Sequence, residues 1–585
     1  MKELQHLNFY FKKYRGRLML GLIITVIATV FKIIVPMIIG DIIDIIKDYV
    51  DGTVSDIKIV KQELLINILI ILGTALMAGL FTFLMRQTFI VVSRNIEFDL
   101  KNDIFQQYER LSLSFYKQNR TGDLMNRISE DVGKVRMYVG PALMYSVTNL
   151  TLLIVALSYM FYKAPTLTLY AIAPLPLLSI AIYKLSAAIH KRSTVVQEYL
   201  SKLTSFTQES FSGISVIKAY GIENRINTKF NELAEGSKDK NIELVRVQAL
   251  FFPLMILLIG LSNILVIYIG GKQYISGEIE HLGTIVEFLI YVNMLTWPVA
   301  VIGWVTSMVQ QAEASQKRIN EFLHEEPEIK NHVTEATPIS GTIEFNNLTF
   351  TYPDTNITAL KNLSFSINSG ETLAIIGNTG SGKSTILELI GRLYDVENGQ
   401  LKINNKSIQD LNLENLRGSI GYVPQDAFLF SDSILNNIKF GKEDASEEEV
   451  MEAAKKASVH KNIIGFKKGY ETVLGERGIT LSGGQKQRVS IARAIIKDPK
   501  ILLFDDCLSA VDTETEEEIL QNINAISNDK TIIIVSHRIS SAKNADKIIV
   551  LNEGEIIQQG PHNELVNTEG YYKELYAKQL LEKEN

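Results

Sequence analysis

The stretch Gly-Asn-Thr-Gly-Ser-Gly-Lys-Ser occupies residues 377–384, between a strand-like apolar run at 372–376 and a helix-like run at 384–394. This order of strand, loop and helix is the setting that a phosphate-binding loop requires. Its glycines let the backbone approach a polyphosphate closely and aim several N–H groups at it. Lys383 supplies a positive charge for the β- and γ-phosphates, and Ser384 supplies a hydroxyl for Mg²⁺. The loop therefore predicts nucleotide binding.

The first half of the 585-residue chain is far more apolar than the second, and the overall apolar fraction of 46% averages over the two. Up to about residue 304 it contains apolar runs near the roughly 20 residues that cross a bilayer. Buried helices of a soluble protein rarely give so many runs of this length in one half of a chain. The pattern predicts six transmembrane helices, near residues 18–40, 64–85, 140–161, 165–183, 251–271 and 282–304.

Charged residues beside these runs set the orientation, because Lys and Arg are retained on the cytoplasmic side. Basic residues precede the first run, acidic residues follow it, and the segment after the second run is basic again. We therefore expect an integral, multi-pass protein of the inner or plasma membrane, with the N-terminus and the second half of the chain in the cytoplasm. The first run is too long for a cleavable signal peptide and lacks a small-residue cleavage site.

The cysteine count and the net charge bear on disulfide formation and on nucleic-acid binding. The single cysteine, Cys507, excludes an internal disulfide and fits a reducing cytoplasm. The net charge of −6 comes without a basic patch, so we expect no nucleic-acid partner.

Two cytoplasmic connections are far longer than ordinary loops. Residues 86–111 and 184–211 show apolar spacing of three and four without an internal proline, which predicts membrane helices continuing into the cytosol. The first is expected to end near Gly122 and the second at Gly213 and Gly221. Periodicity alone leaves open whether their turns contact another domain or form solvated hairpins. The predicted domains are a membrane domain at 1–323, a linker at 324–340 and a second domain at 341–585, which opens with an edge strand from about residue 343.

Further motifs follow the phosphate loop in a fixed order. They are Gly-Tyr-Val-Pro-Gln ending at Gln425, Leu-Ser-Gly-Gly-Gln-Lys-Gln-Arg ending at Arg488, an apolar run closed by Asp505 and Asp506, Ser-Ala-Val-Asp ending at Asp512, and Val-Ser-His ending at His537. A phosphate loop alone supports only nucleotide binding. The whole set resembles an ATP-binding cassette (ABC) transporter of the exporter type, a half-transporter with six membrane helices fused to one nucleotide-binding domain. Residues 114–131 and 213–223 are similar to the loops of such exporters that carry coupling helices.

The resemblance implies a fold class and ligands. The fold is a membrane all-α domain, with six transmembrane helices and long cytoplasmic extensions, followed by an α/β P-loop ATPase domain with a β subdomain and a helical subdomain. The ligands are ATP and Mg²⁺. The implied nucleotide contacts are Tyr352, Gly377, Asn378, Thr379, Gly380, Ser381, Gly382, Lys383, Ser384, Thr385, Ser482, Gly483, Gly484, Gln485 and Asp512.

Roles follow from the family pattern and from chemistry. Tyr352 stacks on adenine, although an aromatic residue at a strand end is more often part of a core. Asp505 orients Mg²⁺ together with Ser384 and Gln425. The catalytic residues are Asp506, Gln425 and His537; a lone histidine after an apolar strand would otherwise be structural.

The stretch Ser482 to Gln485 precedes a helix-like run and presents a hydroxyl, N–H groups and a helix N-terminus to an anion. In the family that anion belongs to ATP held by the opposite subunit. The resemblance therefore implies a dimer in which two nucleotide domains close head to tail over two ATP molecules.

Residue 506 departs from the family pattern, which places glutamate after the Mg²⁺ aspartate as general base. Asp506 keeps the charge but is one methylene shorter, and a misplacement of about 1 Å can cost roughly a hundredfold in rate. We expect slow hydrolysis at this site, although a rotated Asp506 that works normally is not excluded. An altered residue here often marks the degenerate half of a heterodimer, and we slightly favour a heterodimer with a second ABC half-transporter over a homodimer.

The cargo is not specified by the fold. Lys32 and Glu287 interrupt the apolar runs, and ionisable groups in a bilayer usually face a cavity or a partner. The expected function is ATP-driven export of amphipathic small molecules, of the multidrug type, or of lipids. The alternatives are a lipid flippase and a regulatory ATP-binding subunit with little hydrolysis of its own.

Overall fold

The computed structural model describes residues 2–475, 481–509 and 511–584. The chain divides into two compact units, of which one comprises Met1–Tyr108 and Gly122–His324 and the other comprises Glu109–Thr121 and Glu325–Asn585. The short segment 109–121 therefore belongs with the second unit, although the sequence placed it inside the membrane domain. Residues 325–342 contain no helix or strand, and they cover most of the predicted linker.

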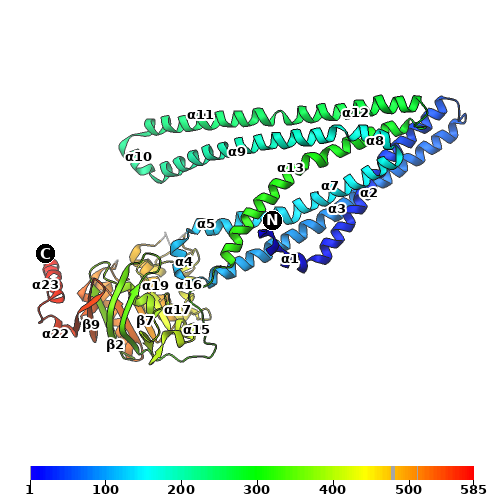
Figure 1. Ribbon diagram of the computed structural model, residues 1–585. Coiled ribbons are helices and arrows are strands. Elements are labelled where there is room, and N and C mark those ends of the chain that lie inside the picture. The colour runs from blue at the N-terminus through cyan, green and yellow to red at the C-terminus, as the bar shows by residue number, and fades with distance from the viewer. Residues whose placement is uncertain (1, 476–480, 510, 585) are drawn as a thin grey trace. The chain divides into compact units, whose positions relative to one another are not determined.

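The first unit is built of long helices (Figure 1). Within the described ranges, six helical stretches are long and apolar enough to cross a membrane: Arg15–Val50, Ile57–Arg110, Thr121–Lys163, Pro165–Ser212, Glu223–Ile275 and Gly283–Leu323. Each contains one predicted apolar run, so the six spans are confirmed. The elements are η1 (Glu3–Leu7), α1 (Asn8–Lys13), α2 (Arg15–Val50), α3 (Ile57–Arg110), α5 (Thr121–Asn126), η2 (Arg127–Asp131), α6 (Val132–Met137), η3 (Tyr138–Ala142), α7 (Leu143–Lys163), α8 (Pro165–Ile172), α9 (Pro174–Ser212), α10 (Ile214–Tyr220), α11 (Glu223–Gln248), α12 (Phe251–Ile275) and α13 (Gly283–Leu323).

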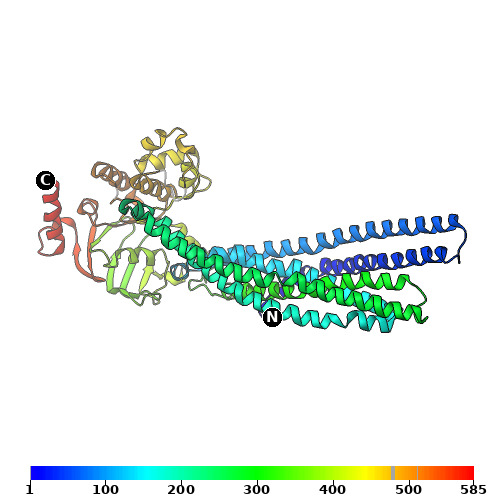
Figure 2. The same ribbon diagram turned by 90° about the horizontal axis from the view of Figure 1, so that it is seen from above.

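The predicted helical extensions are present in α3 and α9. Helix α9 ends at Gly213, as predicted, and both views show α9 and α11 side by side, joined by the short α10 (Figures 1 and 2). The other helix, α3, ends at Arg110, within one residue of the predicted helical segment 86–111, but it does not continue to Gly122, which lies inside α5. The reason is local: Ser112 adopts an extended backbone and starts a new short helix, α4 (Leu113–Gln118).

The second unit contains two sheets. Its elements, besides α4, are β1 (Ile343–Thr351), β2 (Thr358–Ile367), β3 (Thr372–Gly377), α14 (Lys383–Ile390), β4 (Leu401–Ile403), β5 (Lys406–Ser407), η4 (Ile408–Asp410), α15 (Leu413–Gly418), β6 (Ile420–Val423), α16 (Ile434–Lys439), α17 (Glu447–Lys456), α18 (His460–Ile464), η5 (Gly469–Glu471), α19 (Gly483–Ile496), β7 (Ile501–Asp505), α20 (Thr513–Ala525), η7 (Ser527–Asp529), β8 (Thr531–Val535), α21 (Ile539–Ala542), β9 (Lys547–Asn552), β10 (Glu555–Gly560), α22 (His562–Leu565) and α23 (Tyr571–Glu584).

The smaller sheet is antiparallel, with the order β2-β1-β4-β5 among the described strands. Strand β1 pairs with β2 on one side and β4 on the other, so the predicted edge position of β1 is wrong. Alternation of apolar residues shows that one face of a strand is buried, but it does not show how many neighbours the strand has.

The larger sheet has the order β10-β9-β3-β8-β7-β6, and all its pairs are parallel except β10 with β9. Strands β3, β7 and β8 are buried along their whole length, as expected for central strands of a parallel sheet covered on both faces. One apolar core lies between the two sheets and includes Phe345, Leu363 and Leu503. A second core joins the other face to α16, α17 and α19. The α/β fold with a β subdomain and a helical subdomain is confirmed.

Candidate nucleotide-binding site

The candidate site lies where neighbouring parallel strands end. Strand β8 pairs with β3 on one side and β7 on the other, and Val535 aligns with both Ile375 and Asp505. The loops that follow β3, β7 and β8 therefore leave the sheet at one edge. Open α/β sheets bind their ligands at this edge, outside the carboxyl ends of the strands.

Two glycines of the phosphate loop are required by its geometry. A Cβ at Gly377 would lie 2.2 Å from the Leu551 carbonyl oxygen, so a larger residue would displace β9. Gly382 has a φ of +95° and would place a Cβ 2.4 Å from the Ala359 carbonyl oxygen. Only glycine tolerates this conformation and this close approach together.

Lys383 lies inside the loop. Its ammonium donates to the Gly377 carbonyl at 2.9 Å and to the Asn378 carbonyl at 2.8 Å, and only 6% of the residue is exposed. Burial lowers its pKa, and the carboxylates of Asp505 and Asp506 oppose that change. Among the described residues, the buried hydroxyl of Ser381 has no hydrogen-bond partner. The close backbone approach at Gly377 and Gly382 and the buried ammonium of Lys383 on the cavity wall fit a polyphosphate.

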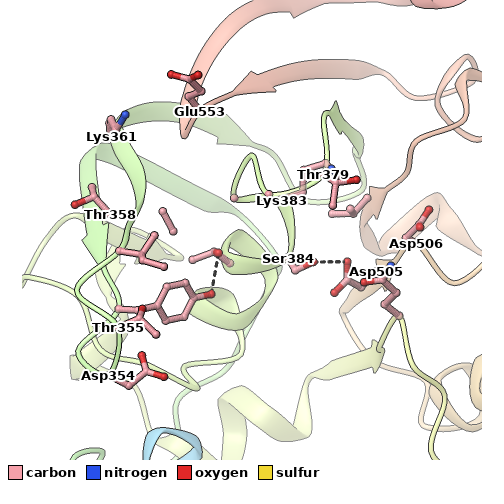
Figure 3. A pocket seen from close by; sticks show the side chains of 18 of the residues that line it. Asp354, Thr355, Thr358, Lys361, Thr379, Lys383, Ser384, Asp505, Asp506 and Glu553 are labelled. Atoms are coloured by element: carbon pink, nitrogen blue, oxygen red, sulfur yellow. Dashed lines mark hydrogen bonds between the residues drawn. The ribbon is translucent and has the colours of Figure 1, made fainter. Parts of the chain in front are cut away.

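Side chains whose oxygen atoms can bind a metal ion lie beside the phosphate loop (Figure 3). The Ser384 hydroxyl donates to Asp505 Oδ1 at 2.8 Å, and the Tyr422 hydroxyl reaches Asp505 Oδ2 at 3.5 Å. Burial raises the pKa of Asp505. Hydroxyl, amide and carboxylate oxygens are the ligands that Mg²⁺ prefers, so Ser384, Gln425 and Asp505 form a chemically suitable set.

Asp506 follows Asp505 in a sharp backbone turn. Its φ is +43°, a value uncommon for a residue other than glycine, and its N–H donates to the Val535 carbonyl at 2.9 Å. Burial raises the pKa of Asp506, and burial together with the Lys383 charge lowers the pKa of His537. The turn therefore brings a carboxylate and an imidazole from two neighbouring strands to the cavity that contains Lys383.

A cavity of about 730 Å³ joins these groups. Eleven of the predicted residues line it, namely Tyr352, Thr379, Gly380, Gly382, Lys383, Ser384, Thr385, Gln425, Asp505, Asp506 and His537. In the described part of the chain, the predicted contacts Ser482, Gly483, Gly484, Gln485 and Asp512 do not line it. Gly377, Asn378 and Ser381 belong to the phosphate loop but are not among the residues that line the cavity.

Tyr352 is held by polar and aromatic neighbours. Its hydroxyl donates to Glu388 Oε2 at 2.9 Å and lies 2.9 Å from Thr385 Oγ1. Its ring packs edge-on against Phe350 and Tyr394, with centroids 5.0 and 5.3 Å away. Tyr352 thus packs against the core between the sheets and also lines the cavity, where the sequence had offered these two interpretations as alternatives.

Lys117 of α4 also lines the cavity, and sequence reasoning missed it. Its ammonium lies 5.1 Å from the ring centroid of Tyr352, 5.0 Å from that of Tyr394, and 3.7 Å from Glu388 Oε1. The only indication in the sequence was its place one residue after the Ser-Phe-Tyr of the first coupling loop. Nothing in the spacing connected that loop with residue 352.

The Leu-Ser-Gly-Gly-Gln motif begins α19. The Ser482 hydroxyl accepts from the Gln485 N–H at 3.3 Å, and Gln485 Oε1 accepts from the Ser482 N–H at 3.0 Å, which forms a capping box. Asp512 caps α20 in a similar way, because it accepts from the Thr515 N–H at 2.9 Å. Within the neighbouring Ser-Ala-Val-Asp motif, Ala510 lies outside the described residues.

Comparisons with known proteins agree with this geometry. Residues 18–299 match the model of the ABC transporter transmembrane region, and residues 360–509 match the ABC transporter model. The chain is 35% identical over 584 residues to the multidrug resistance-like ATP-binding protein MdlA of Escherichia coli, covering 100% of this chain and 97% of that protein. It is 36% identical over 493 residues to an ATP-dependent lipid A-core flippase of Syntrophus aciditrophicus, covering 84% and 82% of the two chains.

A solved structure of a bacterial Atm1-family ABC exporter with ATP bound superimposes with a TM-score of 0.79 at 26% identity, covering 97% of this chain and 98% of that one. The match includes the membrane helices as well as the nucleotide-binding fold. The chain therefore belongs to the ABC transporter family, as a multi-pass plasma-membrane protein with a cytoplasmic nucleotide-binding domain.

Proposed function

We propose that the protein exports amphipathic small molecules, of the multidrug type or lipids, across the plasma membrane as one half of a dimeric ABC exporter that hydrolyses ATP. The relatives support export, since one is named for multidrug resistance and another for lipid A-core flipping. The observation that carries the proposal is the convergence of Lys383, Ser384 and Asp505 on one cavity, in a chain whose other unit has helices of membrane-spanning length.

Each residue at the cavity has a proposed role. Lys383 and the N–H groups of the phosphate loop bind the phosphates, Tyr352 stacks on adenine, and Ser384, Gln425 and Asp505 hold Mg²⁺. When bound, Mg²⁺ neutralises charge on the β- and γ-phosphates. Asp506 accepts the proton of the attacking water, and His537 hydrogen-bonds the γ-phosphate.

A second chain is needed to complete this site. The motif residues Ser482 to Gln485 do not line the cavity of their own chain, and all of them lie in the described ranges. Their capping box orders the start of α19, where N–H groups and a helix N-terminus favour an anion. We propose that they complete the nucleotide site of a partner half-transporter.

The partner is proposed to be a different half-transporter with glutamate after its Mg²⁺ aspartate. Asp506 is one methylene shorter than that glutamate and its backbone is fixed in a turn at positive φ, so its reach toward a water is limited. The protein would then keep an intact Leu481 to Gln485 for the partner's site while hydrolysing slowly at its own. This view also gives the second candidate function, a regulatory ATP-binding subunit with little hydrolysis of its own.

The cargo path is proposed to involve polar groups of the membrane unit. Lys32 on α2 is exposed, whereas Glu287 on α13 is 2% exposed and its Oε1 has no hydrogen-bond partner among the described residues. A buried ionisable group in a membrane domain is costly unless it has a partner or a function. Lys32, which the sequence singled out, and Glu287 are both proposed as candidates for contact with cargo.

Transport by the purified protein in proteoliposomes tests the proposal. The assay measures ATP-dependent movement of a panel of amphipathic dyes and labelled lipids, with the Lys383→Ala variant as control. Wild type, alone or co-purified with its partner half-transporter, should move at least one compound and the variant none. ATP-independent movement that is equal in the two proteins would refute export. ATP binding without turnover or transport would favour the regulatory subunit.

A further inference from the structure

The C-terminal helix α23 is hydrogen-bonded to the loop that carries His537. The side-chain amide of Gln579 uses both of its ends: Oε1 accepts from the Ile539 N–H at 2.8 Å, and Nε2 donates to the His537 carbonyl at 2.9 Å. Because an N–H needs an acceptor and a carbonyl needs a donor, these two partners also fix which end of the amide is which. One side chain thus spans the backbone from residue 537 to residue 539.

The loop needs such support. It leaves the buried end of β8, and Arg538 adopts an extended backbone before the four-residue helix α21 begins. The first N–H groups of a helix have no partner within it. Gln579 satisfies one of them, that of Ile539, from a helix that is forty residues away along the chain. It acts as a cap supplied by another element.

Helix α23 is itself firmly placed. Tyr572 is fully buried in an apolar cluster that contains Ile376, the residue before the phosphate loop, and Ile539. The Tyr571 hydroxyl donates to Asn378 Oδ1 at 2.9 Å. The same helix therefore touches the phosphate loop near its start and the His537 loop farther along.

The His537 loop continues into a second network. The guanidinium of Arg538 donates to the Ser509 carbonyl at 2.9 Å and to Glu516 Oε2 at 2.8 Å. Glu516 is 1% exposed and also accepts from the Ser540 hydroxyl at 2.9 Å. The backbone around His537 is thus fixed on one side by α20 and on the other by α23.

We propose that Gln579 is a positioning residue for ATP hydrolysis, which holds the backbone of His537 so that the imidazole meets the γ-phosphate. The proposal rests on the function proposed above. Gln579 does not line the nucleotide cavity, so it acts only through the His537 loop. Its loss should impair turnover and leave nucleotide binding almost unchanged.

The test compares Gln579→Met with wild type in the full-length protein, reconstituted in lipid. Methionine keeps the length of the side chain and removes both hydrogen bonds. We expect kcat for ATP to fall about tenfold while KM changes less than about twofold, as for loss of a positioning contact. Lys578→Ala, at an exposed neighbouring position of α23, is the control and should match wild type. A raised KM with unchanged kcat would overturn the proposal.

A double variant tests whether Gln579 acts through His537 or only supports the fold in general. In the His537→Ala background, Gln579→Met should have no further effect on the residual kcat, because the residue it positions is already missing. A further drop of the same size as in wild type would show that Gln579 does not act through His537.

Hydrogen–deuterium exchange decides the inference independently of turnover. The Ile539 amide should exchange faster in Gln579→Met than in wild type, while peptides from the membrane helices stay the same. If wild type neither hydrolyses nor transports, the proposed function fails, and exchange alone then tests the contact. Equal exchange of residues 537–541 in both proteins would overturn the inference even if the wild type is fully active.

Discussion

We propose that Asp506 limits how fast this chain hydrolyses ATP on its own. Its main-chain bond to Val535 and its positive φ fix where the side chain begins, so reach toward a water depends on side-chain length. Asp506→Glu adds the methylene that the family pattern has at this position. We expect kcat of the purified protein to rise about tenfold to a hundredfold, with KM for ATP nearly unchanged.

Asp506→Asn is the matched control, because it keeps the size of the side chain and removes the base. It should lower the turnover below that of wild type. If Asp506→Glu hydrolyses ATP no faster than wild type, side-chain length is not what limits this site, and the geometric argument for a slow half-site fails.

We expect Lys117 to affect the part of the cavity beside Tyr352. Its charge lies over the rings of Tyr352 and Tyr394 and close to Glu388, which itself accepts from the Tyr352 hydroxyl. Replacing Lys117 with Met removes a contact between a cation and aromatic rings worth about 0.5–1 kcal/mol at an exposed site. We expect KM for ATP to rise about threefold.

Lys117→Arg keeps the cation and should restore most of the affinity. Arg120→Ala removes a basic residue from the same segment at an exposed position and should leave KM unchanged. An equal rise in KM for Arg120→Ala would show that the overall charge of the segment matters, rather than the contact with Tyr352.

At the scale of elements, sequence patterns predicted what each segment becomes more reliably than what it touches. Apolar length located the membrane helices, and the glycine-rich loop was found between a strand and a helix as expected. The interruption of the helix between Arg110 and Gly122 and the internal place of β1 were missed, because local periodicity records burial of a face but neither such a break nor the number of neighbouring strands.

The contacts of α4 and α23 were missed for a related reason. Lys117 and Tyr352, or Gln579 and His537, are brought together only by tertiary packing, and one polar side chain in a helix gives no periodic pattern. Motif residues were found because phosphate chemistry restricts them to glycine, lysine, serine and aspartate in a fixed order. Supporting residues are under no such restriction.

Helix α20 contains a buried residue, Glu516, whose replacement we expect to lower the stability of the protein. Glu516 is buried at 1% exposure and accepts from Arg538 and Ser540, so it joins α20 to α21. Glu516→Gln keeps the shape but removes the charge and turns one acceptor into a donor that faces other donors. We expect a loss of about 1–3 kcal/mol in unfolding free energy, measured by urea denaturation of the full-length protein in detergent.

The neighbouring Glu517 provides the control. Its carboxylate is 61% exposed and lies 3.9 Å from Lys543, so Glu517→Gln should change stability by less than about 0.5 kcal/mol. Equal stability of Glu516→Gln and wild type would mean that Arg538 and Ser540 find other partners at no cost.

At the scale of the whole molecule, the sequence correctly predicted that the protein consists of a helical membrane part and an α/β part. It also placed Leu481 to Gln485 at a nucleotide, yet these residues do not line the cavity of their own chain. A single chain contains every motif without bringing them all to one site. We propose that a second chain supplies the missing arrangement.

Co-expression of two inactive variants tests that assembly. Lys383→Ala removes the phosphate-loop charge, and Ser482→Arg blocks the helix start that is proposed to face the partner's nucleotide. In a head-to-tail dimer with two-fold symmetry, a mixed pair combines both lesions in one site and leaves the other site intact. If the chain also pairs with itself, random mixing should restore roughly a quarter of the wild-type ATPase activity, since half the dimers are mixed and each has one intact site of two.

Each variant alone should be inactive, and purification through two different affinity tags would isolate the mixed pair for direct assay. No recovery in the tagged pair would contradict shared sites between copies of this chain. ATPase activity that appears only when the wild-type chain is paired with a different half-transporter would instead support the heterodimer. In that heterodimer, the slow site proposed around Asp506 is complemented by a faster one.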